Sequence, residues 1–192
     1  MTAAWAIRIA DENDLEQIMR IEHECFASDA WSSENMHDEL VGAERFYVVA
    51  YSTISDDPDR LIGYAGLAKS PLVSQGDIQT IAVSPLVRGR GLGRALMIEL
   101  IAEAGRRGAN RLFLEVRADN PTAISLYRTL DFREVGVRAG YYQPDNVDAL
   151  TMRLEPVPGG PSTRSLGPIG SEVTGGPASA APVGTWPKDG AC

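Results

Sequence analysis

A run of glycines and arginines, RGRGLGR at residues 88–94, constrains the fold of this 192-residue chain more than any other stretch. The segment DIQTIAV (77–83) before it predicts a strand, and the apolar spacing after it predicts a helix to about Arg107, closed by Gly108. RLFLEVRA (111–118) predicts the next strand. A strand, a crossover helix and a strand form a right-handed unit, so we expect these two strands to be parallel neighbours.

The rest of the pattern predicts a single mixed α/β domain. Asp11 and Ser32 are N-cap candidates for two helices near the N-terminus, and Asn120-Pro121 is expected to cap a short helix that runs through Leu130. The second of the early helices is expected to end at Gly42. We expect further strands at residues 5–10, 45–51, 61–69, 132–142 and 148–155. A turn is expected at residues 56–60. The fold class is therefore α/β with a mixed sheet (α+β elements around one parallel pair).

The composition changes at Pro156. The last 37 residues hold seven of the twelve prolines and eight of the nineteen glycines. Such a segment cannot bury enough apolar area to offset its ordering entropy. We expect a domain over 1–155 and a Gly/Pro-rich disordered tail over 156–192, in which Trp186 is either a docking residue or an incidental aromatic.

Charge and cysteine content narrow the class of protein. The formal net charge of −8 argues against nucleic acid as the main partner. It either suits a cationic or amine-bearing substrate or reflects solubility alone. Two cysteines, Cys25 and Cys192, form no disulfide framework, which fits a reducing compartment. His23 and Cys25 do not share a helix face, so no metal site is expected. No leader-like segment or long apolar run is present, so a cytoplasmic, soluble protein without membrane contact is expected.

The glycine-arginine loop is placed where an anion would bind. It follows a strand and opens a helix, whose first amides lack intrahelical partners and carry partial positive charge. Glycines let backbone N–H groups approach a phosphate closely. The P-loop pattern and the GxGxxG dinucleotide pattern are both absent, and the loop reads R-x-x-G-x-G from Arg88 to Gly93. Taken alone, the same residues could be a flexible polar loop.

Two separated stretches resemble a known family. IAVSPLVRGRGLGRALM is similar to the acetyl-CoA-binding motif of the GNAT N-acetyltransferases, and LEVRADNPTAISLYRTLDF (114–132) is similar to the next motif of their RimI-type branch. ECFASDAWSSENMHDEL and RAGYYQPDNVDALTM match the same branch, so the resemblance covers about 5–155. It departs from the usual pattern at Arg88, where Gln is frequent, and at Val147, where Glu is frequent.

The resemblance implies a fold and a cofactor site. It implies a mostly antiparallel sheet with a splayed central parallel pair, flanked by helices, that binds acetyl-CoA as cosubstrate without a metal. Backbone groups of Ile81, Ala82 and Val83 would hold the cofactor arm, and Asn120 would touch it. The residues that would hold the pyrophosphate are Gly89, Arg90, Gly91, Leu92, Gly93 and Arg94.

The resemblance also assigns two catalytic residues. On the 111–118 strand, alternation places Glu115 on the face opposite Leu114, and the pattern alone favours a surface carboxylate paired with Arg117. The resemblance instead makes Glu115 the general base, acting through a water. Helical spacing alone favours Tyr127 as a core residue, in a stripe with Ala123 and Leu130, whereas the resemblance makes it the general acid for the departing thiolate.

The substrate side is the least constrained part of the site. Trp31, Tyr141 and Tyr142 are the candidates for lining a peptide groove, although aromatics near turns also seal core edges. Because neighbouring strand residues alternate, at most one tyrosine of the pair should face the substrate. The resemblance implies acetylation of a protein N-terminus, the N-terminal alanine of small-subunit ribosomal protein eighteen. Two alternatives stay open: a GNAT enzyme for a small amine or a lysine side chain, and a non-catalytic acyl-CoA-binding module.

Overall fold

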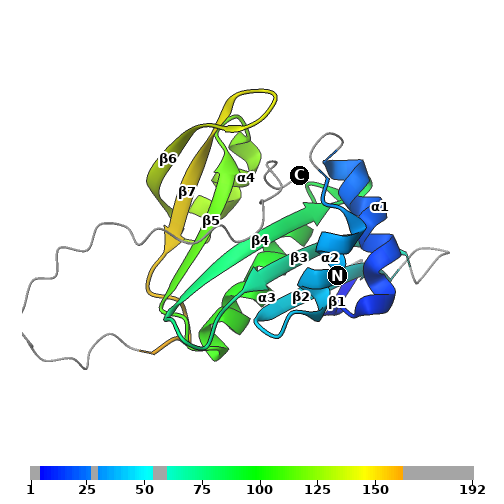
Figure 1. Cartoon of the computed structure of the whole chain (residues 1–192), viewed down its shortest axis with the longest axis horizontal. Coiled ribbons are helices and arrows are strands. Elements are labelled where there is room, and N and C mark those ends of the chain that lie inside the picture. The colour runs from blue at the N-terminus through cyan, green and yellow to red at the C-terminus, as the bar shows by residue number, and fades with distance from the viewer. Residues whose placement is uncertain (1–4, 27–29, 54–59, 162–192) are drawn as a thin grey trace, which may run out of the picture.

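The protein, described by a computed structural model over residues 5–26, 30–53 and 60–161, is built on one seven-stranded sheet. In spatial order the strands are β1 (Trp5–Ile9), β2 (Arg45–Ser52), β3 (Leu61–Ala68), β4 (Gln75–Val83), β5 (Arg111–Arg117), β7 (Val147–Leu154) and β6 (Arg133–Tyr142). The β4–β5 pair is parallel and every other neighbouring pair is antiparallel (Figure 1). The predicted mixed α/β class is confirmed.

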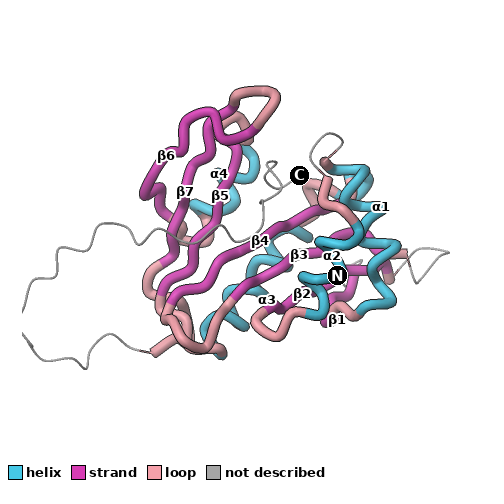
Figure 2. The backbone as a smooth tube through the Cα atoms, in the orientation of Figure 1, coloured by secondary structure: helices cyan, strands magenta, loops and turns pink. Residues whose placement is uncertain are grey.

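Within the described residues, four α-helices cover the two faces of the sheet. Helices α1 (Leu15–Cys25) and α2 (Ser33–Val41) lie on one face, and α3 (Leu92–Arg106) and α4 (Pro121–Arg128) lie on the other (Figure 2). Among the described helices, none has the length and apolarity that a membrane span requires.

The helix ends are set by local side chains. The Asp11 side chain accepts from the Asn13 amide and forms a capping box with Asp14 around a short 3₁₀ turn (Glu12–Asp14) that leads into α1. The Ser32 hydroxyl accepts from the Asn35 amide, which confirms that cap. Such caps satisfy amides that have no intrahelical acceptor.

The two helix C-termini with glycine differ from each other. Gly108 has a φ of +79° after α3, as an αL cap requires, whereas Gly42 ends α2 in extended backbone. Helix α4 ends at Arg128, two residues before the predicted Leu130. Of the predicted turn at 56–60, all but the last residue lies outside the described residues.

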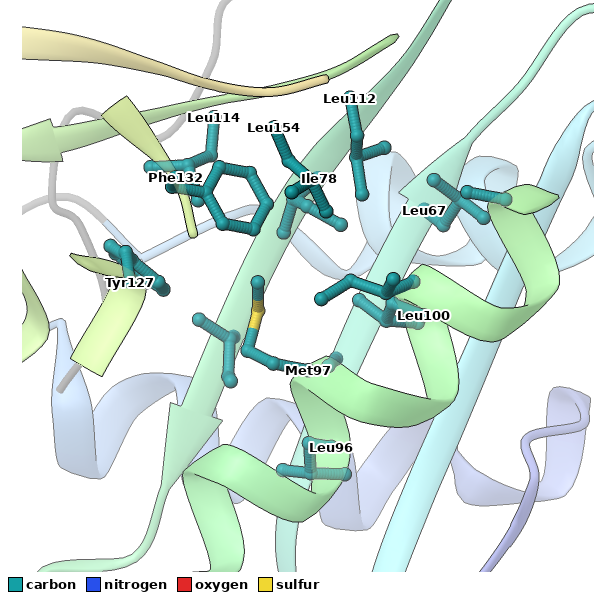
Figure 3. Packing of buried hydrophobic residues seen from close by; sticks show 14 of the residues in the cluster. Leu67, Ile78, Leu96, Met97, Leu100, Leu112, Leu114, Tyr127, Phe132 and Leu154 are labelled. Atoms are coloured by element: carbon teal, nitrogen blue, oxygen red, sulfur yellow. The ribbon is translucent and has the colours of Figure 1, made fainter. Parts of the chain in front are cut away.

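The larger apolar core lies between the sheet and α3 and α4. Figure 3 shows Leu96, Met97 and Leu100 of α3 packed toward the side chains of β3, β4 and β5. Alternate residues of β5 point into this core, as predicted: Leu112, Leu114 and Val116 are buried. Each such buried side chain stabilises the fold by about 1.5–3 kcal/mol.

The parallel strands β4 and β5 form a fork. They pair only over Gln75–Asp77 and Arg111–Phe113, although β4 continues to Val83. A register shift between β3 and β4 leaves one β4 residue, Gln79, without a partner position on β3. Gln79 lies two residues beyond Asp77, the last β4 residue that pairs with β5. Such a bulge bends a strand and increases its twist. The two strands consequently diverge toward their carboxyl ends (Figure 1).

The globular part extends past the expected boundary at residue 155. Val157 is 3% exposed and belongs to the larger core. Its amide donates to the Asn110 carbonyl at 3.1 Å, and Gly105 of α3 lies directly against the Pro158 backbone. The packed domain therefore continues past the expected boundary at 155, because Val157 of the Pro/Gly-rich segment is buried in the core. The rest of the expected tail, 162–192 with Trp186, lies outside the described residues.

Candidate active site

The glycine-arginine loop builds a pocket at the start of α3. Gly89 and Gly91 have φ values of +72° and +87°, and a Cβ on either would point into open space. Gly91 is the N-cap of α3, and its carbonyl accepts the first helical bond from Ala95. The first amides of α3 therefore have no intrahelical acceptor and open toward the loop.

This pocket has a volume of about 270 Å³ and is shared by two helices. Predicted residues that line it are Val83, Gly89, Gly91, Leu92, Gly93 and Arg94. Arg88, Thr122 and Leu126 line it as well and were not predicted. Thr122 and Leu126 come from α4, whose Asn120-Pro121 cap could have indicated their position. The first amides of α3 and the guanidinium groups of Arg88 and Arg94 lie at the same pocket. The pocket therefore suits a diphosphate.

The other predicted cofactor residues lie near this pocket but do not line it. Ile81 and Ala82 are buried on β4 beyond the fork, paired with β3 on one side only. Arg90 is exposed on the loop. The Asn120 side chain accepts from the Ala123 amide at 3.0 Å, which confirms the cap, while its contact with a cofactor stays a prediction.

The Val83 carbonyl, at the end of β4, already has two side-chain donors. Arg88 Nε donates to it at 3.2 Å, and Cys25 Sγ of α1 lies 3.5 Å away. Arg88 thus connects the pocket wall to the last residue of the forked strand. The resemblance pointed to the backbone of Val83 and did not indicate these side-chain partners.

Glu115 projects from β5 on the face away from the larger core. Its Oε1 accepts from Arg138 Nη1 of β6 at 2.8 Å, and the carboxylate is 19% exposed as a side chain. Its Oε2 is buried and has no hydrogen-bond partner within the described part of the chain. The alternative pairing with Arg117 is wrong, because Arg117 pairs with Asp119 at 2.9 Å and with Asp145.

Tyr127 is placed as a core residue. It is 2% exposed, and its ring lies 6.1 Å from that of Phe132 (Figure 3). Burial raises the pKa of its hydroxyl above the ordinary value, so the phenol stays protonated at neutral pH. The placement thus agrees with the spacing argument, and the general-acid role stays a prediction.

The aromatic candidates divide into exposed and buried residues. Trp31 is half-buried beside α1, and its backbone amide donates to the buried Glu22 carboxylate at 3.0 Å. Tyr142 is 2% exposed beneath the Arg117 guanidinium, so its side chain belongs to the interior and does not line an open groove.

The tyrosine pair does not follow simple alternation. A register shift between Arg138 and Tyr142, with Gly140 at a φ of +58°, breaks the pattern of β6. The two rings meet edge to face at 5.2 Å. Tyr141 is half-buried, and the Arg138 guanidinium lies 4.2 Å above its ring. Burial and the nearby Glu115 charge raise the pKa of Tyr141 to about 12.

Comparison with known proteins identifies the architecture. The sequence profile of the acetyltransferase (GNAT) family matches residues 14–132. The chain belongs to the GNAT family. Its sheet, fork and α3 loop are thus those of an acetyltransferase fold.

Two mycobacterial relatives align over most of the domain. An uncharacterized protein of Mycobacterium leprae is 37% identical over 145 residues, which cover 74% of this chain and 38% of that protein. The N-alpha-acetyltransferase RimI of Mycobacterium tuberculosis is 36% identical over 145 residues, which cover 74% of this GNAT chain and 87% of that protein.

Solved structures show the same fold. The ribosomal-protein-S18-alanine N-acetyltransferase of Escherichia coli superposes with a TM-score of 0.72 at 29% identity, covering 84% of this chain and 98% of that chain. Arabidopsis thaliana NAA60, in complex with acetyl-CoA, superposes with a TM-score of 0.69 at 23% identity, covering 79% of this chain and 98% of that chain. The second likeness shows the fold alone.

Proposed function

We propose that this GNAT protein transfers the acetyl group of acetyl-CoA to a protein N-terminal α-amine in the cytoplasm, and that its substrate is the N-terminal alanine of ribosomal protein bS18. The observation that carries the proposal is the fork, which has a diphosphate-sized pocket at the end of one strand and a partly buried carboxylate on the other. The names of the relatives from Mycobacterium tuberculosis and Escherichia coli support the substrate.

The residues present fit acetyl-CoA. Gly89 and Gly91 leave open space where side chains would stand, and Arg88 and Arg94 supply positive charge at the pocket. The backbone of β4 from Ile81 to Val83 lies beside the gap of the fork and would run along the cofactor arm. When bound, acetyl-CoA supplies a thioester carbonyl that an amine can attack.

The catalytic groups of the chain divide the proton transfers between them. A protein α-amine has a pKa of about 8, so roughly a tenth of it is neutral at pH 7. Glu115 would remove a proton from the amine, directly or through a water, and Tyr127, which burial keeps protonated, would supply a proton to the departing thiolate. The −8 net charge of the chain favours the approach of a basic ribosomal protein terminus.

The test is thiol release from acetyl-CoA with peptides of the bS18 N-terminus. We expect release with a free N-terminal alanine and none with the same peptide blocked at its N-terminus. Glu115→Gln and Tyr127→Phe should each lower turnover by a factor on the order of 10²–10⁴ with acetyl-CoA binding unchanged. Glu99→Gln, an exposed glutamate of α3, is the matched control and should behave as wild type.

Two outcomes would contradict the proposal. Thiol release that persists with a blocked N-terminus and requires a lysine would assign the enzyme to side-chain acetylation. Tight binding of acetyl-CoA, with no release for any amine, would instead make the protein a binding module.

A further inference from the structure

The buried carboxylate of Glu22 has no part in the chemistry proposed above. Glu22 lies in the last turn of α1 and is 0% exposed. Its Oε1 accepts from the Trp31 backbone amide at 3.0 Å, and its Oε2 accepts from the Tyr64 hydroxyl of β3. A carboxylate is costly to bury, and an apolar side chain would pack at this position of α1 without that cost.

The Tyr64 side of this link reaches the forked strand. Tyr64 is fully buried, and the Thr80 side chain is a second hydrogen-bond partner of its hydroxyl. Thr80 belongs to the part of β4 beyond the last position that pairs with β5, and it comes immediately before the Ile81–Val83 backbone. Glu22 is thus joined through one phenol to the strand that would run along the cofactor arm.

The last turn of α1 touches the end of β4 at two further places. Cys25 Sγ lies 3.5 Å from the Val83 carbonyl, and the Ser84 hydroxyl donates to Glu24 Oε2 at 3.3 Å. The end of α1 is therefore held against the forked strand by several side chains. The Glu22 carboxylate extends this hold to the backbone of Trp31.

Trp31 lies on the same face of the sheet as Glu115. A smaller apolar core lies between the sheet and helices α1 and α2, and Trp31 packs against it beside Tyr64 and Ala82. Glu115 projects from β5 on this face, because the alternate residues of β5 point into the larger core. Helix α1 lies beside the end of β4, and β5 diverges away from it (Figure 1). Trp31 and Glu115 thus stand on opposite sides of the fork.

We propose that Glu22 is a positioning residue for the acceptor peptide: its carboxylate holds the backbone of Trp31 beside the fork, so that the indole forms one wall of the acceptor groove. The proposal rests on the proposed acetyltransferase function, in which Trp31 is a candidate groove residue. Glu22 is not among the residues that line the described pocket at the start of α3. Its loss should therefore weaken the binding of the peptide and leave the binding of acetyl-CoA unchanged.

Hydrogen-bonding chemistry predicts which substitution of Glu22 preserves the link. Glu22→Gln keeps a carbonyl oxygen for the Trp31 amide, and its NH₂ group can donate to the Tyr64 oxygen, because a phenol hydroxyl both donates and accepts. The Tyr64 proton can then turn to the Thr80 hydroxyl. Glu22→Leu has a side chain of similar size and keeps neither hydrogen bond.

The experiment measures kcat and KM for the peptide with free N-terminal alanine at saturating acetyl-CoA. We expect Glu22→Leu to raise the peptide KM by about tenfold, the effect of losing one buried hydrogen bond, with kcat within about twofold of wild type. Glu22→Gln should keep both constants near those of wild type. Ile18→Val, one turn earlier on the buried face of α1, is the matched control, since it loosens the same core without touching the link.

A double-mutant cycle separates positioning from a merely structural role. Trp31→Ala removes the wall itself, so Glu22→Leu should cause no further rise in the peptide KM in that background. Two effects that multiply, or a Glu22→Leu enzyme whose kcat falls while its peptide KM stays constant, would overturn the proposal. Thermal unfolding and calorimetric binding of acetyl-CoA are measured on every variant, and the affinity for acetyl-CoA should match wild type throughout.

Hydrogen exchange of the Trp31 amide tests the link without any substrate. By NMR we expect this amide to be protected in wild type, Glu22→Gln and Ile18→Val, and to exchange about tenfold faster or more in Glu22→Leu. An unprotected Trp31 amide in wild type overturns the positioning role, whichever amine the enzyme acetylates and whether or not Glu22→Leu folds. A wild-type enzyme with a protected Trp31 amide that is inactive on the peptide overturns the bS18 assignment instead.

Discussion

Replacing Asp77 by Asn should make the protein more stable, and more so at higher pH. Burial and the negative charge of Glu115 raise the pKa of Asp77 to about 6 in the folded protein, against 3.8 for an exposed aspartate. The folded state therefore binds this proton more tightly than the unfolded chain, and the stabilisation is complete below pH 4 and is lost as the pH rises through 6. The pKa difference corresponds to about 3 kcal/mol at pH 8 as an upper value. Asn has the same shape and no charge, so it avoids this loss.

Urea unfolding of wild type and Asp77→Asn at a series of pH values measures the effect. The free energy of unfolding of the variant should exceed that of wild type by about 1–3 kcal/mol at pH 8, and the difference should shrink to near zero at pH 4. Glu99→Gln, an exposed glutamate of α3, is the matched control. A difference that stays constant from pH 4 to 8, or that favours wild type at pH 8, would refute the burial argument for Asp77.

Three other substitutions test the loop, the domain boundary and the buried acid of α1. Gly91→Ala places a Cβ at a φ of +87° and should weaken acetyl-CoA binding, measured by calorimetry. Gly108→Ala, with a similar φ of +79° at the far end of α3, is the control and should bind as wild type does. Equal affinities of the two variants would contradict the assignment of the α3 loop as an anion site. Gly105→Ala forces a Cβ into the backbone of the 156–160 segment and should lower the melting temperature, while a chain ending at residue 161 should keep it. Glu22→Leu leaves the buried Tyr64 hydroxyl without its acceptor and should cost about 1–3 kcal/mol in urea unfolding, and a neutral result would show that water replaces the carboxylate.

Local features of the site could be predicted from the sequence. The helix caps at Ser32 and Asn120 are hydrogen bonds between residues three positions apart, so the local amino-acid sequence is enough to predict them. Gly108 ends α3 at positive φ because such a backbone suits glycine. The buried and exposed faces of β5 follow from strict alternation. Each of these depends on a residue and its near neighbours in the chain.

Other features of the site could not be predicted from the sequence, because they depend on residues that are far apart in the chain. Arg138 of β6 is 23 positions from Glu115 of β5 in the chain, and its side chain reaches Glu115 across β7, the strand between them. No local sequence pattern encodes this strand order. Tyr142 is buried where a register shift in β6 interrupts alternation, and Val157 is buried because its segment packs against Asn110 and Gly105, which lie about 50 residues earlier in the chain.

The sequence by itself determined the strand, the glycine loop and the helix that build the anion pocket, since hydrophobic period, capping and glycine placement act over a few residues. Only the tertiary structure decided which charges meet at the fork. Asp77 and Glu115 lie on strands joined by a long crossover, and their distance, burial and partners are set by how the sheet assembles and where its parallel strands part.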